Sequence, residues 1–100
     1  NVVEWSAPAK QDLKLIHDYI AKDSKFYAKK VSLEIVEKSE TLNTSPEIGR
    51  IVPEIDDPKI RELLIYSYRL IYEIFPKKIA ILALIHGKRD FSKINLADRR

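Results

Sequence analysis

The stretch IRELLIYSYRLIYEIFPKKIAILALIH, residues 60–86, decides the fold. It is dense in Ile, Leu, Tyr and Phe, and it is interrupted only at residues 66–67 and 76–78. Short polar breaks between such runs are typical of hairpin turns, so the stretch predicts a three-stranded antiparallel meander. Its last run, IAILALI at 79–85, is apolar at every position, which predicts a strand covered on both faces.

Two helices are predicted ahead of the meander. Ser6 can cap the first helix, in which apolar residues recur at positions 9, 13, 16 and 20 up to about residue 22. Asp23 and Ser24 interrupt this pattern, and a second apolar stripe at positions 28, 31, 35 and 42 follows. Two such helices joined by a tight polar turn form an αα-hairpin, and the residues NVVEW at 1–5 predict a short strand before it.

Residues 43–59 connect the two halves of the chain. They hold three of the five prolines and one of the two glycines, so they cannot continue a helix. The order of one strand, two helices and three antiparallel strands predicts an α+β fold with the hairpin on one side of the sheet. A chain of 100 residues with 45% apolar content fits a single domain spanning residues 1–100.

The strand predicted at 68–75 has two unlike faces. One face would carry Tyr68, Leu70, Tyr72 and Ile74, and the other Arg69, Ile71, Glu73 and Phe75. Because one hairpin covers only one face of a sheet, we expect the second face to remain bare. A bare face that mixes apolar and charged side chains is typical of a surface for a protein partner or for self-association.

The composition excludes several classes of protein. The chain has no cysteine, which excludes disulfides, thiolate zinc sites, iron–sulfur clusters and thiol catalysis, and favours a cytoplasmic location. Two glycines cannot build a glycine-rich phosphate loop, and no apolar run is long enough to span a membrane. HExxH and GxSxG motifs are missing as well, so we expect no metal and no cofactor.

The net charge of +3 lies entirely in residues 86–100, HGKRDFSKINLADRR, because residues 1–85 are balanced. A basic terminus beside a neutral body indicates an anionic partner, either a nucleic acid or an acidic protein surface. A terminus that only improves solubility is the alternative.

His86 ends the central strand and precedes Gly87, Lys88 and Arg89, and Arg69 could approach it from the neighbouring strand. Cations and an imidazole can together cleave a phosphodiester, because cations stabilise the developing charge and the imidazole moves protons. The same group could bind a phosphate or carboxylate without reaction, and Arg69 could simply pair with a nearby carboxylate. For Arg61, a cross-strand ion pair is the plain interpretation.

From about residue 3 to residue 89, the chain resembles the RelE/ParE superfamily of toxins from bacterial type II toxin–antitoxin systems. The resemblance rests on the helical hairpin and on four motifs: SPEIGRIVPE at 45–54, IREL at 60–63, YRLIYEI at 68–74 and IHGKR at 85–89. It implies a growth-inhibiting toxin that a cognate antitoxin neutralises, with operator DNA bound only through the antitoxin. The antitoxin would cover the bare face, with Ile71, Phe75 and Phe91 as its contact candidates.

The superfamily implies two mechanisms. RelE-like members cleave mRNA on the ribosome, and in this chain Arg69, His86 and Arg89 would carry that reaction. The tyrosine and the lysines of the RelE pattern fall, however, on Asn95, Ile60 and Glu62, which cannot replace them.

The segments GRIVPE, IREL and HGKRD look more like the ParE branch, whose members poison DNA gyrase. We therefore expect a gyrase inhibitor rather than an enzyme, with Arg61, Arg69, Lys88 and Arg89 as contacts to the target or to phosphate. The alternatives are the ribosome-dependent RNase and a non-toxic adaptor that binds nucleic acid or protein on the same fold.

Overall fold

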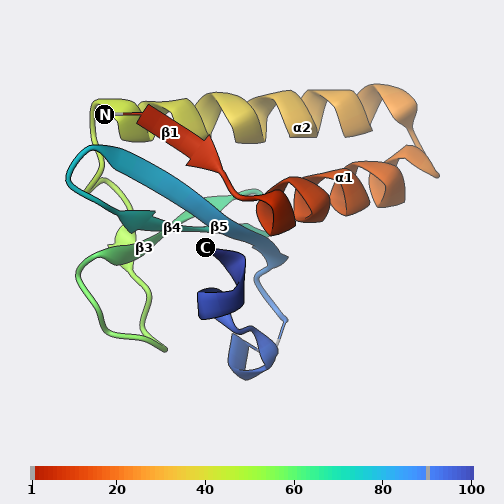
Figure 1. Ribbon diagram of the computed structural model, residues 1–100. Coiled ribbons are helices and arrows are strands. Elements are labelled where there is room, and N and C mark those ends of the chain that lie inside the picture. The colour runs from red at the N-terminus through yellow and green to blue at the C-terminus, as the bar shows by residue number, and fades with distance from the viewer. Residues whose placement is uncertain (1, 90) are drawn as a thin grey trace.

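A computed structural model describes residues 2–89 and 91–100 and has the predicted α+β architecture (Figure 1). Its strands are β1 (Val2–Trp5), β2 (Arg50–Ile51), β3 (Ile60–Ile65), β4 (Tyr68–Ile74) and β5 (Lys78–His86), and its α-helices are α1 (Ala7–Ala21) and α2 (Lys25–Glu40). Three short 3₁₀ helices complete it: η1 (Thr41–Asn43), η2 (Phe91–Lys93) and η3 (Leu96–Arg99). Asn1 of the predicted first strand and Asp90 of the HGKRD segment lie outside the described residues.

The two helices begin where the sequence predicts. The Ser6 hydroxyl accepts a hydrogen bond of 3.2 Å from the Ala9 amide, and the Ser24 hydroxyl accepts one of 3.0 Å from the Tyr27 amide. Each side chain satisfies a backbone donor that the first helical turn leaves open. The predicted apolar stripes of both helices pack on one face of the sheet, where they form a core with Leu70 and Tyr72.

The five strands form one sheet in the order β1-β5-β4-β3-β2. β1 pairs with β5 in parallel, and the other neighbours are antiparallel, so the predicted meander is confirmed. β5 is buried along most of its length, as its unbroken apolar run predicts. β2 was not predicted, because residues 43–59 were expected to be an irregular connection; two of them add a short edge strand beside β3.

The expectation of a bare second sheet face is wrong. The C-terminal segment, residues 91–100, folds across that face, on the side opposite the two helices (Figure 1). Phe91, Ile94 and Leu96 form a second apolar core there with Ile71 and other strand residues. Ile71 is 0% exposed and Phe91 8% exposed, so the chain itself buries the surface that was expected to await a partner.

Two ion pairs at the C-terminal end of η3 hold the C-terminal segment in place. Arg99 pairs with Asp12 of α1, whose carboxylate also accepts a 3.0 Å hydrogen bond from the Leu84 amide. Arg100 donates to Glu73 over 2.7 Å. Part of the C-terminal basic charge is therefore neutralised within the molecule, whereas Lys88 and Arg89 form no ion pair with any residue in the described ranges.

Candidate functional site

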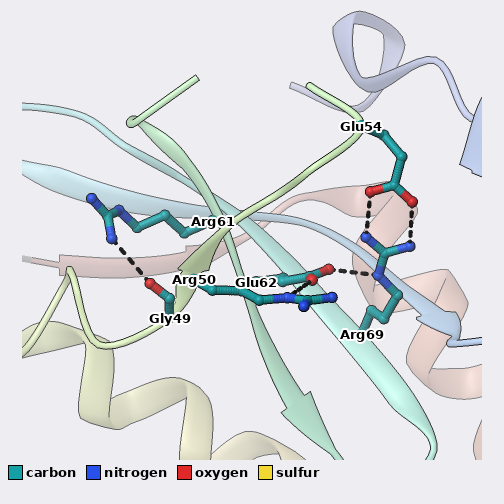
Figure 2. Close-up of polar contacts among 6 residues, drawn as sticks. All are labelled: Gly49, Arg50, Glu54, Arg61, Glu62 and Arg69. Atoms are coloured by element: carbon teal, nitrogen blue, oxygen red, sulfur yellow. Dashed lines mark hydrogen bonds and ion pairs between the residues drawn. The ribbon is translucent and has the colours of Figure 1, made fainter. Parts of the chain in front are cut away.

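Four charged side chains meet on the second sheet face, and we call them the arginine–glutamate cluster: Arg50, Glu54, Glu62 and Arg69 (Figure 2). The geometry of strands β3 and β4 fixes the positions of Glu62 and Arg69. Because side chains alternate along a strand, Glu62 of β3 and Arg69 of β4 project to the same face as Ile71, toward the C-terminal segment. Arg50 comes from β2, and Glu54 from the loop that follows it.

Every charge in the cluster is paired. Arg69 donates from Nε to Glu62 over 2.5 Å, and from Nη1 and Nη2 to the two oxygens of Glu54 over 2.9 and 2.8 Å. Arg50 donates to the second oxygen of Glu62. The Arg69 guanidinium also lies 4.9 Å from the centre of the Phe91 ring. Two cations and two anions balance, so the cluster offers no surplus charge to a ligand.

Burial and hydrogen bonding set the electrostatics of the cluster. Glu62 is 1% exposed and Arg69 6% exposed, which is tolerable only because both are paired. Hydrogen bonds from Arg69 lower the pKa of Glu54 from 4.5 to about 2. Hydrogen bonds to Glu54, and then to Glu62, raise the pKa of Arg69. An anionic ligand can reach Arg69 only if Glu54 first moves away.

Arg61 supports the loop that carries the cluster. The cross-strand ion pair predicted for it is wrong, because its guanidinium instead donates to the carbonyls of Gly49 and Pro58 over 3.1 and 2.9 Å. Figure 2 shows Arg61 reaching toward Gly49, away from Arg69. The buried hydroxyl of Tyr72 adds a second anchor, donating to the Pro46 carbonyl and accepting from the Gly49 amide.

His86 does not join Arg69. In the β4–β5 register His86 pairs with Tyr68 and Arg69 with Ile85, so the two side chains project to opposite faces of the sheet. The His86 ring packs edge-on against the Tyr68 ring at 5.8 Å, and its Nδ1 accepts a hydrogen bond from the Lys88 amide. The expectation that Arg69 approaches His86, on which the set for phosphodiester cleavage depends, is therefore wrong.

The three candidates for partner contact differ in their exposure. Ile71 and Phe91 are buried under or within the C-terminal segment, so a partner would meet them only after that segment moved. Phe75 is partly exposed, with the Lys78 ammonium 5.3 Å from the centre of its ring. Contact with a partner stays a prediction for all three.

Two open hollows flank the helical hairpin. The larger, of about 820 Å³, lies between β1, α1 and α2 and includes Trp5, Leu13 and Val36. The second, of about 560 Å³, lies where the hairpin meets the β3–β4 turn, and His86 lines it together with several tyrosines. Sequence reasoning missed this hollow because its walls come from four separate parts of the chain: α1, α2, the β3–β4 turn and the end of β5.

Two kinds of feature, a metal-binding group and a membrane-spanning helix, are absent from the described residues. Across residues 2–89 and 91–100, no group of three or more His, Asp or Glu side chains is placed to hold a metal ion. No helix in this part of the chain has the length and apolar character needed to cross a bilayer.

Comparison with known proteins finds a matching family model and similar solved structures. The family model described as the ParE toxin of the type II toxin–antitoxin system parDE matches residues 3–91. The solved structure of a chromosomal ParDE toxin–antitoxin system from P. aeruginosa superimposes with a TM-score of 0.71 at 25% sequence identity, covering 85% of this chain and 94% of that chain. No curated protein sequence matches.

Proposed function

Because the chain belongs to the ParE toxin family of type II toxin–antitoxin systems, we propose that it inhibits DNA gyrase and that a cognate antitoxin neutralises it. Gyrase and the antitoxin would meet the toxin in the cytoplasm, and operator DNA would be bound only through the antitoxin. We propose that the toxin acts by binding, not by catalysis.

The main support for this proposal is that Arg69 is fully paired with carboxylates and lies away from His86. A nuclease needs free cations and a proton-transfer group around one phosphate. Here Arg69 is saturated by Glu54 and Glu62 on one sheet face, and His86 lies on the other. This separation supports a binding function over the ribosome-dependent RNase.

Lys88 and Arg89 are the contacts that we propose for the target. Both are exposed and follow the end of β5, and neither pairs with a carboxylate within the described residues. Exposed unpaired cations favour an acidic protein surface or a phosphate backbone, both of which a gyrase–DNA complex offers. Arg61 and Arg69, also predicted as contacts, we assign instead to holding the loop and the cluster.

Incubation of the purified toxin with DNA gyrase and relaxed plasmid tests the proposal. We expect loss of supercoiling together with trapped cleaved plasmid, and recovery when the antitoxin encoded beside the toxin gene is added. The double variant Lys88→Gln/Arg89→Gln should inhibit at least about tenfold more weakly, because hydrogen bonds to charged groups contribute about 1.5–3 kcal/mol each. Lys29→Gln/Lys30→Gln, which removes the same charge from the exposed face of α2, is the matched control.

Normal supercoiling without trapped cleavage, at every toxin concentration, would exclude gyrase as the target. Cleaved transcripts on toxin-loaded ribosomes would support the RNase instead. Harmless expression in the absence of an antitoxin would support the non-toxic adaptor.

A further inference from the structure

The second hollow, here called the tyrosine cleft, concentrates one residue type. Four of the five tyrosines of the chain line it, together with His86. Its lining residues are Leu15, Ile16, Tyr19, Ile20, Tyr27, Val31, Tyr66, Ser67, Tyr68 and His86. Aliphatic side chains of α1 and α2 and Ser67 of the β3–β4 turn supply the rest of its surface, and none of the carboxylates that the structure describes lines it.

Several of these apolar side chains are exposed to a degree that is costly for a free protein. Tyr19 is 70% exposed, Leu15 58%, Tyr66 49% and Tyr27 45%. Tyrosines grouped in a hollow are typical of the anchor points of protein interfaces, because the ring buries a large area with little loss of conformational freedom. The exposure therefore indicates a surface that is covered when a partner binds.

The backbone at Tyr66 gives a second, independent indication. Tyr66 begins the two-residue turn between β3 and β4 with φ of 56°, a left-handed conformation that strains any residue other than glycine. Its hydroxyl donates a hydrogen bond to Glu34, which raises the pKa of Tyr66 to about 12 and keeps the proton in place at neutral pH. The ring is thus held rigidly at the cleft in a turn where glycine would fit better, and such strain concentrates at binding sites.

The charges around the cleft select an acidic occupant. The Lys22 ammonium lies 5.8 Å from the centre of the Tyr19 ring, and Lys88 is joined to His86 through its amide. Of the nearby carboxylates, Asp18 is paired with Lys14, and Glu34 keeps its charge but is directed at the Tyr66 hydroxyl. Cations beside an apolar hollow complement a segment with apolar side chains and flanking carboxylates.

We infer that the tyrosine cleft binds an apolar, acidic segment of the target protein, an inference that rests on the proposed function. The cleft adjoins the proposed target contacts, because only Gly87 separates Lys88 and Arg89 from His86, and the Lys88 amide donates to the His86 ring. Its aliphatic side chains suit protein side chains better than the bases of single-stranded nucleic acid, which stack between aromatic rings. The partner surface of the toxin thereby extends from two exposed cations into a preformed hollow.

The test compares Tyr19→Ala/Tyr27→Ala with Phe26→Ala. Phe26 is 79% exposed on α2 but does not line the cleft, so its removal controls for the loss of an exposed aromatic ring. For each protein we would measure the concentration that inhibits purified gyrase by half, the affinity for the cognate antitoxin and the circular dichroism melting curve. We expect the double variant to stay folded and to inhibit gyrase at least about tenfold more weakly, as loss of interface anchors does. Its antitoxin affinity, and both properties of Phe26→Ala, should stay within about twofold of wild type.

Three results would overturn the inference. In the first, a folded Tyr19→Ala/Tyr27→Ala variant inhibits gyrase as strongly as wild type. In the second, antitoxin affinity falls as much as gyrase inhibition, which would make the cleft part of the antitoxin surface. In the third, wild type sediments as a dimer and the double variant as a monomer, while both inhibit gyrase equally. The occupant of the cleft would then be a second copy of this chain.

A variant with a disturbed melting curve is replaced by Tyr19→Ser alone, whose side chain is the most exposed of the four tyrosines, with the same three outcomes. Failure of the proposed function gives a different result, since wild-type toxin would then not inhibit gyrase at all. In that case the inference falls with it.

Discussion

Arg69 and Glu54 face each other through two parallel hydrogen bonds, of 2.9 Å from Nη1 and 2.8 Å from Nη2. This two-pronged geometry is the one in which an arginine binds a phosphate or a free carboxylate. The loop after β2 therefore places the chain's own carboxylate where an anionic ligand would bind. The arginine of the YRLIYEI segment is thereby held as a structural ion pair.

The pH dependence of stability should report the Arg69–Glu54 pair. The pKa of Glu54 is lowered from 4.5 to about 2, so its contribution to folding is fully present above about pH 4.5 and is lost as the pH falls through about 2. Glu54→Gln should be less stable than wild type at pH 7, with a difference that shrinks between pH 5 and 2. Because the Glu54 side chain is 42% exposed, solvent screening keeps this difference small.

Urea unfolding at a series of pH values measures this difference. Glu37→Gln, on the exposed side of α2, is the control and should show no such convergence. A pH-independent difference for Glu54→Gln would contradict the prediction.

Substitution of Glu62 should lower the stability of the fold far more than substitution of its exposed partner Arg50. Glu62→Gln removes a buried charge that two arginines share, and it leaves Arg69 buried beside a weaker acceptor. We expect a loss of about 2–4 kcal/mol in the free energy of unfolding, as for one partner of a buried pair. Arg50→Gln should cost less than about 1 kcal/mol, because the Arg50 side chain is 59% exposed. Equal losses in urea unfolding would contradict this ranking.

Gly49 has no room for a side chain. A Cβ atom there would lie 2.5 Å from the Glu62 carbonyl oxygen and 2.6 Å from the Tyr72 hydroxyl, both of which are buried. Gly49→Ala should therefore lower the free energy of unfolding by about 1–3 kcal/mol through overpacking. At Gly87 the nearest atom is 3.3 Å away, so Gly87→Ala is the matched control and should cost much less. Thermal melting of the two variants gives the comparison, and equal melting temperatures would refute it.

The Tyr72 hydroxyl should stabilise the loop that carries the cluster. It donates to Pro46 over 2.7 Å and accepts from Gly49 over 3.0 Å, and burial raises its pKa, so it stays protonated. Tyr72→Phe leaves a buried amide and a carbonyl unsatisfied, which should cost about 1–3 kcal/mol.

Tyr68→Phe is the matched control for Tyr72→Phe. The Tyr68 hydroxyl forms no hydrogen bond with a residue in the described ranges, so its loss should leave the unfolding midpoint nearly unchanged. Hydrogen exchange of the Gly49 amide should also quicken in Tyr72→Phe only. Unchanged exchange there would show that the loop is held by other contacts.

The elements with a clear period were predictable from the sequence, and the irregular ones were not. The alternation at 68–74 identified the two faces of β4, and the unbroken apolar run identified β5. β2 is only two residues long within a segment rich in proline, and residues 91–100 form short 3₁₀ turns without a helical or strand period. Local patterns carry no signal for such pieces, because tertiary contacts create them.

The sequence identified some residues of the site, but it did not predict which residues they contact. Arg69 was identified from its strand, yet its partner Glu54 lies in the connection that was expected to be irregular. The tyrosine cleft was missed for the same reason, since Tyr19, Tyr27 and Tyr66 lie on two helices and a turn. Their proximity follows from how the hairpin packs on the sheet, which no single segment encodes.

The parallel pairing of β1 with β5 also determines when the sheet can finish folding during synthesis. Val2 lies beside Lys78 and Trp5 beside Ile81, so β1, which leaves the ribosome before the other strands of this sheet, pairs with β5, which leaves it after them. Contacts between residues so far apart in the chain form slowly, because the entropy cost of closing a long loop comes before the contacts stabilise the fold. During synthesis β1 therefore waits unpaired, and the sheet closes only after β5 has emerged, a delay that postpones any toxicity until translation of this region has ended.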